Sequence, residues 1–174
     1  PEGTYNEMMA LNGIVGNASQ MMGHLEEWGG PTTFPHFAIG WAWAGNTPFQ
    51  WTKQVASHFG GTRNGMVLHW PNGIKAKGEI RSQFHHVIDV APTVLEAARL
   101  PEPKLVNGVK QRPMDGVSML YSVDDAKAAD RRTTQYFEMF GNRAIYHDGW
   151  VAATLHKAPW EEAPRATLEQ DTWE

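Results

Sequence analysis

Two side chains in the first half of the chain, Lys53 and His58, have the chemistry to act on an anionic substrate. A lysine ammonium group offers three hydrogen-bond donors around a compact charge, which suits an oxyanion that gains negative charge as a bond breaks. The imidazole of His58 titrates near neutral pH and can donate to a substrate or act near a leaving group. By residue type alone, Lys53 is an ordinary solvated lysine and His58 is a structural residue at a helix end.

Other polar residues have simpler interpretations. The guanidinium of Arg63 can grip two oxygens of an anion, but we expect it to tie its loop to a carboxylate inside the protein. The pair His85-His86 is a poor chelate because adjacent residues point apart in both strands and helices, so we expect no metal site there. Asp89 is better explained as the N-cap of a helix than as a catalytic base.

The composition is that of a globular protein without attraction for polyanions. Apolar residues make up 41% of the 174 residues, charged residues 20%, and the net charge is −4. We therefore expect neither nucleic acid nor a membrane as a partner. The chain has no cysteine, which excludes disulfides, thiolate zinc sites and a cysteine nucleophile. The compartment stays unknown.

The first half predicts short elements separated by glycine-rich turns. Residues 1–12 are expected to form at least one helical turn, and residues 29–50 a long ordered loop rich in Gly, Pro and Trp. Residues 52–58 are predicted as a short helix that ends at Gly60-Gly61. Residues 66–70 form a short apolar run that predicts a strand.

The clearest predicted helix has Asp89 as N-cap and Pro92 in its first turn. Its buried face is predicted from four apolar residues at helical spacing, Ile88, Ala91, Leu95 and Ala98. Residues 101–118 follow as a Pro- and Gly-rich connection.

The last third changes to a period typical of strands. Residues 135–139, 144–147 and 150–154 are β-prone, and Asp148-Gly149 is a two-residue turn of the primed type, which predicts that the last two strands are antiparallel neighbours. The predicted fold is α/β. The first part of the chain is expected to combine helices with parallel strand structure, and the last third to form a small antiparallel meander.

Eight tryptophans are present, and most of them lie in the first half of the chain. Their irregular spacing favours packing inside ordered coil over a surface that stacks on ligands, because most buried aromatic residues serve packing. A ligand-stacking role for Trp41, Trp43 and Trp51 is the alternative.

Four blocks, in order, resemble the late part of the type I, arylsulfatase-like sulfatases. Residues 53–65 (KQVASHFGGTRNG) resemble the family's block from lysine to GG-x-R, and residues 86–96 (HVIDVAPTVLE) its H-x-x-D-x-x-P-T helix. Residues 115–118 (DGVS) resemble its D-G-x-S turn, and residues 142–145 (NRAI) with Gly149-Trp150 its C-terminal hairpin. Residues 1–12 are also similar to the segment that follows the family's Asp-Asn-Gly metal motif.

The resemblance implies an alkaline-phosphatase-like α/β fold and hydrolysis of sulfate esters. The family uses a formylglycine made from Cys or Ser in a C/S-x-P-x-R motif, and a calcium ion held by Asp and Asn. By the resemblance, Lys53 is the lysine that reaches the sulfate oxygens, and His58 is a weaker second candidate. Residues 1–118 would be the C-terminal part of the catalytic domain, and residues 119–174 the start of an antiparallel subdomain.

The formylglycine and calcium motifs are absent from this sequence. The chain has no Cys, no Ser followed by x-Pro-x-Arg, and no two-Asp motif of the first strand. It begins at Pro1 and ends at residues 172–174, where the family runs on. We therefore expect a fragment that is inactive alone, with its nucleophile and calcium ligands in a missing N-terminal half.

The predicted function is one wall of the active site of a sulfuric ester hydrolase that acts on a small sulfate ester. A phosphomonoester or phosphonate ester hydrolase of the same superfamily is an alternative, because the nucleophile that separates these branches is not in the chain. A non-catalytic module that binds flat ligands through its tryptophans is the second alternative.

Overall fold

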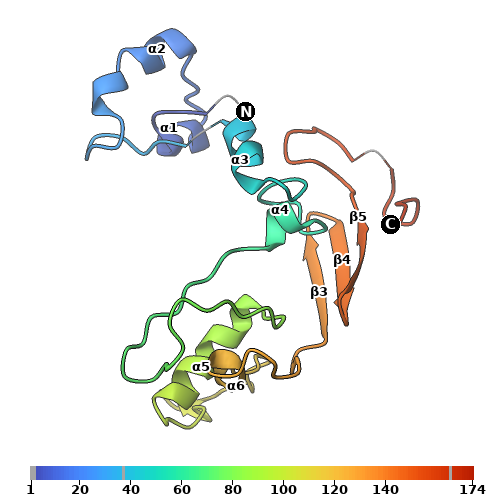
Figure 1. Cartoon of the computed structure of the whole chain (residues 1–174). Helices are drawn as coiled ribbons and strands as arrows, with labels where there is room; N and C mark the ends of the chain where they lie inside the picture. The colour runs from blue at the N-terminus through green and yellow to red at the C-terminus, as the bar shows by residue number, and fades with distance from the viewer. Residues whose placement is uncertain (1–2, 37, 165) are drawn as a thin grey trace. The chain divides into compact units, whose positions relative to one another are not determined.

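The computed structural model describes residues 3–36, 38–164 and 166–174 (Figure 1). Two compact units can be distinguished within the chain. The first comprises residues 1–63, 137–144 and 153–174, and the second comprises residues 64–136 and 145–152. None of the described helices is long and apolar enough to cross a membrane.

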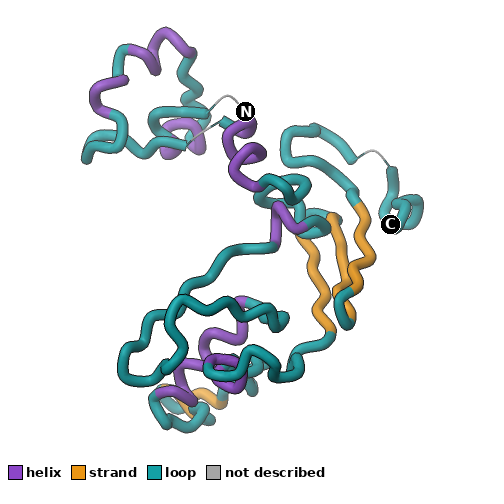
Figure 2. Tube along the Cα trace, in the orientation of Figure 1, coloured by secondary structure: helices purple, strands orange, loops and turns teal. Residues whose placement is uncertain are grey.

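The first unit carries short helices joined by turns (Figures 1 and 2). They are α1 (Glu7–Leu11), α2 (Ala18–Met22), the 3₁₀ turn η1 (Leu25–Glu27), α3 (Ile39–Asn46) and α4 (Phe59–Thr62). Helix α1 confirms the helical turn predicted near the N-terminus. The long loop predicted over residues 29–50 is wrong in part, because α3 occupies its second half.

The predicted helix over residues 52–58 is wrong, and α4 begins only at Phe59. The residues before it form turns closed by hydrogen bonds from Val55 N to Thr52 O (3.1 Å) and from His58 N to Val55 O (3.2 Å). Gln54 has φ 78°, which no α-helix accommodates. Gly60 and Gly61 lie inside α4 instead of stopping a helix. A Cβ at either would overlap a backbone carbonyl oxygen, Trp51 O or Val55 O respectively.

The second unit is built around α5 (Val90–Ala97), which follows the 3₁₀ turn η2 (Val87–Asp89). It also contains a small hairpin, β1 (Leu105–Val106) and β2 (Val109–Lys110), and the short helix α6 (Leu120–Val123). The hairpin lies within the connection predicted over residues 101–118. The strand predicted over residues 66–70 is wrong, because none of the described segments pairs with it and Val67 stays 93% exposed.

Helix α5 confirms the predicted helix with Pro92 in its first turn, but the predicted buried face is wrong. Ile88, Ala91 and Ala98 are exposed, whereas Asp89 and Thr93 are the buried side chains of this region. The physical reason is that the helix packs through hydrogen bonds of these two polar residues. Its apolar side chains are left on the outside of the described chain.

A three-stranded sheet in the order β3-β4-β5 confirms the predicted meander. Its strands are β3 (Thr134–Met139), β4 (Asn142–His147) and β5 (Trp150–Thr154). Asp148 and Gly149 have φ 45° and 89°, so both central residues of that turn are left-handed, as in the predicted primed type. Two-residue turns of this kind join antiparallel neighbours. The parallel strand pairing predicted for the preceding half is not formed by the described strands.

Candidate functional site

Lys53 lies at the surface of a turn whose neighbouring residues are buried. Thr52, Val55 and Ser57 are 2%, 0% and 2% exposed, while Lys53 is exposed. Within the described part of the chain, its ammonium group has no hydrogen-bond or ion-pair partner. The three N–H donors of the exposed Lys53 ammonium group are therefore available to bind an anion.

Two asparagine side chains hold the backbone of this turn in place. Asn46, at the end of α3, donates from Nδ2 to the carbonyl oxygens of Trp51 (3.0 Å) and Gly60 (2.9 Å). Asn142, at the start of β4, donates from Nδ2 to Gln54 O (3.3 Å). Sequence reasoning did not predict these contacts, which join Asn46 to residues 5 and 14 positions away and Asn142 to a residue 88 positions away.

Asn142 is 1% exposed and uses the full capacity of its amide. Besides the bond to Gln54, its Nδ2 donates to Lys157 O (2.8 Å), and its Oδ1 accepts from the backbone N–H groups of His156 (3.0 Å) and Lys157 (3.1 Å). A buried amide with two donor and two acceptor contacts is fully satisfied. The NRAI block therefore supports the lysine turn through its first residue.

His58 lies at the N-cap position of α4, not at a helix C-terminus as predicted. The helix dipole at this end disfavours a positive charge, so the dipole does not explain the residue. Its Nδ1 is 2.8 Å from the hydroxyl of the buried Ser57, and its ring lies 6.2 Å from the ring of Trp51. Burial lowers the pKa of His58, and the charge of Glu174 opposes this effect only in part. His58 is therefore neutral at pH 7.

Lys53 and His58 belong to the same anchored segment, but the described residues show no contact between their two side chains. Arg63, the third polar residue of the block, does not bind a carboxylate as predicted. Its guanidinium lies over the rings of Phe49 (4.9 Å) and Phe59 (5.5 Å) as a cation–π contact. This contact holds the side chain of Arg63 against two aromatic rings at the end of α4.

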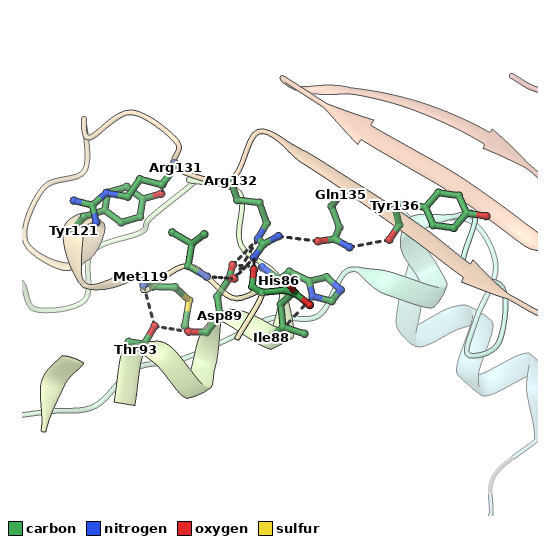
Figure 3. A network of polar contacts seen from close by, with 12 residues as sticks. His86, Ile88, Asp89, Thr93, Met119, Tyr121, Arg131, Arg132, Gln135 and Tyr136 are labelled. Carbon is green, nitrogen blue, oxygen red and sulfur yellow. Dashed lines mark hydrogen bonds and ion pairs between the residues drawn. The ribbon is translucent and has the colours of Figure 1, made fainter. Parts of the chain in front are cut away.

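The second unit contains a buried ion pair between Asp89 and Arg132 (Figure 3). The Asp89 side chain is 0% exposed and that of Arg132 is 10% exposed. Arg132 Nε lies 3.1 and 3.0 Å from the two carboxylate oxygens, and Nη2 also donates to Asp89 Oδ1. Figure 3 shows Arg132 reaching Gln135 as well, whose Oε1 is 3.0 Å from Nη1.

The Asp89 carboxylate also joins the H-x-x-D helix to the D-G-x-S turn. It accepts from the backbone N–H of His86 (2.9 Å) and from that of Val117 (2.8 Å). The Thr93 hydroxyl donates to Asp89 O (2.6 Å) and accepts from Met119 N (2.9 Å). The two sequence blocks are thus one polar network in space.

Asp89 lies at the N-cap position of α5, as predicted, but its side chain makes no capping hydrogen bond to that helix. It is the third residue of a capping box on η2, with His86 at the N-cap position. Burial raises the pKa of Asp89, but the bonds from Arg132, Val117 and His86 outweigh it, so the pKa is lowered overall. These contacts give the Asp89 carboxylate a structural role in joining the two blocks.

His85 and His86 both have protein partners. His85 Nε2 lies 3.3 Å from Ser122 Oγ, and His86 Nδ1 accepts from Ile88 N (3.4 Å). Burial lowers the pKa of both imidazoles. Among the described residues, no group of three or more His, Asp or Glu side chains is arranged to hold a metal ion.

A third charged cluster, which the sequence did not reveal, lies beside the Asn142 anchor. Asp171 contacts Arg143 Nη2 at 2.6 Å and His156 Nδ1 at 3.1 Å. Burial raises the pKa of Asp171, yet the bonds from His156 and Arg143 lower it overall. Ala153 and Glu174 exchange two backbone hydrogen bonds (3.0 and 2.9 Å), so the C-terminal segment is held on β5 as well.

A comparison with protein families supports the first two of the four sequence blocks, residues 53–65 and 86–96, which lie inside the matched segment. The family model named Sulfatase matches residues 21–100. The matched segment contains α3, α4 and α5, together with Lys53 and His58. Sulfatases are hydrolases of sulfate esters with an alkaline-phosphatase-like fold, and the mixed helices and strands described here agree with an α/β class. Residues 21–100 are therefore similar to the sulfatase family, and through it to the alkaline-phosphatase-like superfamily.

Proposed function

We propose that this chain forms one wall of the active site of a sulfuric ester hydrolase, in which Lys53 binds the sulfate group of a small sulfate ester. The observation that carries the proposal is the exposed, unpaired ammonium of Lys53 on a turn whose flanking residues are buried, inside the family match. An anchored cation aimed at solvent is preorganised for an anion, because little side-chain reorganisation of the turn is needed on binding.

Hydrolysis of a sulfate monoester breaks the S–O bond to the alcohol and transfers the sulfuryl group, finally, to water. Negative charge develops on the departing alcohol oxygen and is redistributed over the sulfate oxygens. The ammonium of Lys53 donates hydrogen bonds to those oxygens and stabilises their charge in the transition state. His58 is neutral at pH 7, so it contributes a hydrogen bond at most and no full positive charge.

The family's calcium ion and formylglycine are not matched by the residues described here. No cluster of carboxylates or imidazoles in this part of the chain fits a metal ion, and the sequence has no cysteine. We therefore propose that the nucleophile and the calcium ligands come from a segment of the enzyme that this sequence does not contain.

The exposed apolar surface of the second unit supports the same proposal. Val87, Val90 and Val94 on and before α5 are 75%, 41% and 59% exposed. Side chains of this kind are normally buried, and a row of them on one helix is typical of a face that another part of the protein covers. In the complete enzyme, we expect this face to pack against the remainder of the catalytic domain.

The test is the activity of two polypeptides, the 174-residue chain and the complete enzyme that contains it. The chain alone is expected to release no product from an aryl sulfate above the buffer rate. In the complete enzyme, Lys53→Ala is expected to lower kcat/KM by about 10²–10³, the effect of removing one preorganised oxyanion donor. Lys77→Ala, at another exposed lysine, is the matched control and should leave kcat/KM unchanged.

Comparing kcat/KM for the sulfate ester and the phosphate ester of the same alcohol distinguishes a sulfatase from a phosphoester hydrolase of the same superfamily. A complete enzyme that prefers the phosphate ester by kcat/KM contradicts the sulfatase assignment, and saturable sulfatase activity of the purified chain contradicts the proposal that it is one wall only.

A further inference from the structure

The chain contains four Asn-Gly pairs, a dipeptide with its own spontaneous chemistry. Asparagine is a thermolabile residue, because the backbone nitrogen of the following residue can attack its side-chain amide carbon. Glycine as the following residue leaves this nitrogen most accessible, since it has no side chain to hinder the approach. The four pairs are Asn12-Gly13, Asn64-Gly65, Asn72-Gly73 and Asn107-Gly108.

In two of the pairs a hydrogen bond holds the attacking nitrogen. Gly13 N donates to Ala10 O (3.0 Å), and the Asn12 side chain is held as well, because its Nδ2 donates to a backbone carbonyl of α1 at 2.7 Å. Gly73 N donates to Trp70 O (3.0 Å), and a Cβ added at Gly73 would overlap the Trp70 ring. These nitrogens are bonded, and that of Gly73 is also covered.

The pair Asn107-Gly108 forms the turn of the hairpin β1-β2. Both residues have left-handed backbones, with φ 50° and 80°, between the paired residues Val106 and Val109. The amide carbon of an asparagine reaches the next nitrogen only after rotation about the backbone between them. Strand pairing on both sides of the turn opposes that rotation.

The pair Asn64-Gly65 differs from the other three. It lies in residues 63–70, which form no helix, strand or turn, and both of its residues are exposed. Within the described part of the chain, none of the backbone N–H groups of residues 65–70 donates a hydrogen bond. A Cβ added at Gly65 meets no atom within 4 Å. The Gly65 nitrogen is therefore neither bonded nor covered.

We propose that Asn64 is a modification site of this chain, at which the side-chain amide is lost through attack by the Gly65 nitrogen. This nitrogen forms a bond to Cγ of Asn64, and the Cγ–Nδ2 bond breaks. Nδ2 leaves as ammonia with the proton that the Gly65 nitrogen gives up. Water then opens the resulting cyclic imide at either carbonyl carbon, which leaves aspartate or isoaspartate at position 64. Water is the only other reactant.

The reaction changes both the charge and the backbone at the end of the block that carries Lys53. Either product has a carboxylate in place of the amide, which lowers the net charge of −4 by one. The new charge directly follows Arg63, whose guanidinium lies over the rings of Phe49 and Phe59. Isoaspartate also adds one bond to the main chain, because its link to Gly65 runs through the side-chain carbon.

The first measurement follows all four pairs in the 174-residue chain during incubation at mildly alkaline pH, with and without urea. Asn64 and Asn72 share the tryptic peptide 64–75, so tandem mass spectrometry assigns each change to one residue. In the native chain Asn64 is expected to react at least about 10-fold faster than each of the other three. In urea the four rates should agree within about 3-fold, because all four pairs then have the same accessible nitrogen. Equal native rates, a faster reaction at another pair, or the same ranking and spread in urea would overturn the inference.

The second measurement tests the imide route with two glycine variants. Gly65→Ala is expected to slow the reaction at Asn64 at least about 10-fold, because a methyl group beside the nitrogen hinders its attack. Gly45→Ala is the matched control, since its Cβ also meets no atom within 4 Å and its nitrogen does not follow an asparagine. Circular dichroism verifies that both variants keep the parent fold. A Gly65→Ala chain that reacts at the parent rate, or a product that contains aspartate without isoaspartate, would overturn the inference.

Discussion

The side chain of Asn142 donates a hydrogen bond to the backbone carbonyl of Gln54, 88 positions earlier in the chain. Gln54 adjoins Lys53 and has a left-handed backbone, φ 78°. A residue other than glycine adopts this conformation at a cost, so surrounding contacts must hold it there. The hairpin of the last third of the chain thus stabilises the turn that presents Lys53.

Replacing Asn142 by alanine should leave the carbonyl oxygens of Gln54 and Lys157 and the N–H groups of His156 and Lys157 without this partner. We expect Asn142→Ala to lower the free energy of unfolding by about 1–3 kcal/mol, the cost of leaving buried polar groups unsatisfied. Urea denaturation measures the change. Asn72→Ala, in an exposed turn, is the control and should stay within about 0.5 kcal/mol of the parent. A loss at Asn142 no larger than at Asn72 contradicts the anchoring role.

The buried pair of Asp89 and Arg132 should respond strongly to the loss of one partner. Arg132→Met leaves the carboxylate of Asp89 buried without its cation, which costs about 3–5 kcal/mol. The double change Asp89→Leu with Arg132→Met should recover only part of this loss, because no charge is then left alone but the backbone N–H groups of His86 and Val117 lose their acceptor. Thermal or urea unfolding of the parent chain and these two variants tests the coupling.

A surface ion pair of the same unit provides the comparison. Arg112 and Asp115 lie 3.5 Å apart with side chains 86% and 74% exposed. Arg112→Ala should cost no more than about 1 kcal/mol, because solvent screens exposed pairs. If Arg132→Met and Arg112→Ala lower the free energy of unfolding by similar small amounts, the polar network around Asp89 does not hold the second unit together.

Stability should fall in two stages as the pH is lowered. Burial lowers the pKa of His58, His85 and His86, so the unfolded state takes up protons first, and stability declines as the pH falls below the unfolded value of about 6.5. The pKa of Asp89 is also lowered in the folded state. Its contribution is present above the unfolded value of about 3.9 and is lost as the pH falls through the folded pKa.

Unfolding measured from pH 8 to pH 2 tests both stages. His58→Gln should reduce the first decline, and Asp89→Asn should reduce the second while lowering stability at neutral pH. Stability that rises on acidification between pH 7 and pH 5 would refute the assignment of the first stage to the histidines.

Gly60 tests the close packing behind the Lys53 turn. A methyl group at this position overlaps the carbonyl oxygen of Trp51, so Gly60→Ala should destabilise the chain by about 1–3 kcal/mol despite its better helix propensity. Gly65→Ala meets no atom within 4 Å and should be neutral. Far-UV circular dichroism during heating compares the two. A stabilised Gly60→Ala would show that the turn is looser than described.

The local elements were predicted where turn chemistry and strand pattern acted together. The strands around Asp148-Gly149 and the helix that contains Pro92 formed as predicted, because a primed turn and a first-turn proline act within a few residues. The predicted strand over residues 66–70 did not form, since a strand needs a partner for its backbone groups and none of the described segments pairs with it.

The sequence by itself indicated the resemblance to sulfatases and the antiparallel strands of the last third, because each follows from short blocks of residues. Tertiary structure decided what surrounds them. The partners of Asn142, Asp89 and Asp171 lie up to tens of residues away, and hydrogen bonds of this kind depend on where the chain returns rather than on local spacing. The buried face of α5 was also decided by tertiary contacts. The hydrogen bonds of Asp89 and Thr93 orient the helix, and the spacing of its apolar residues does not.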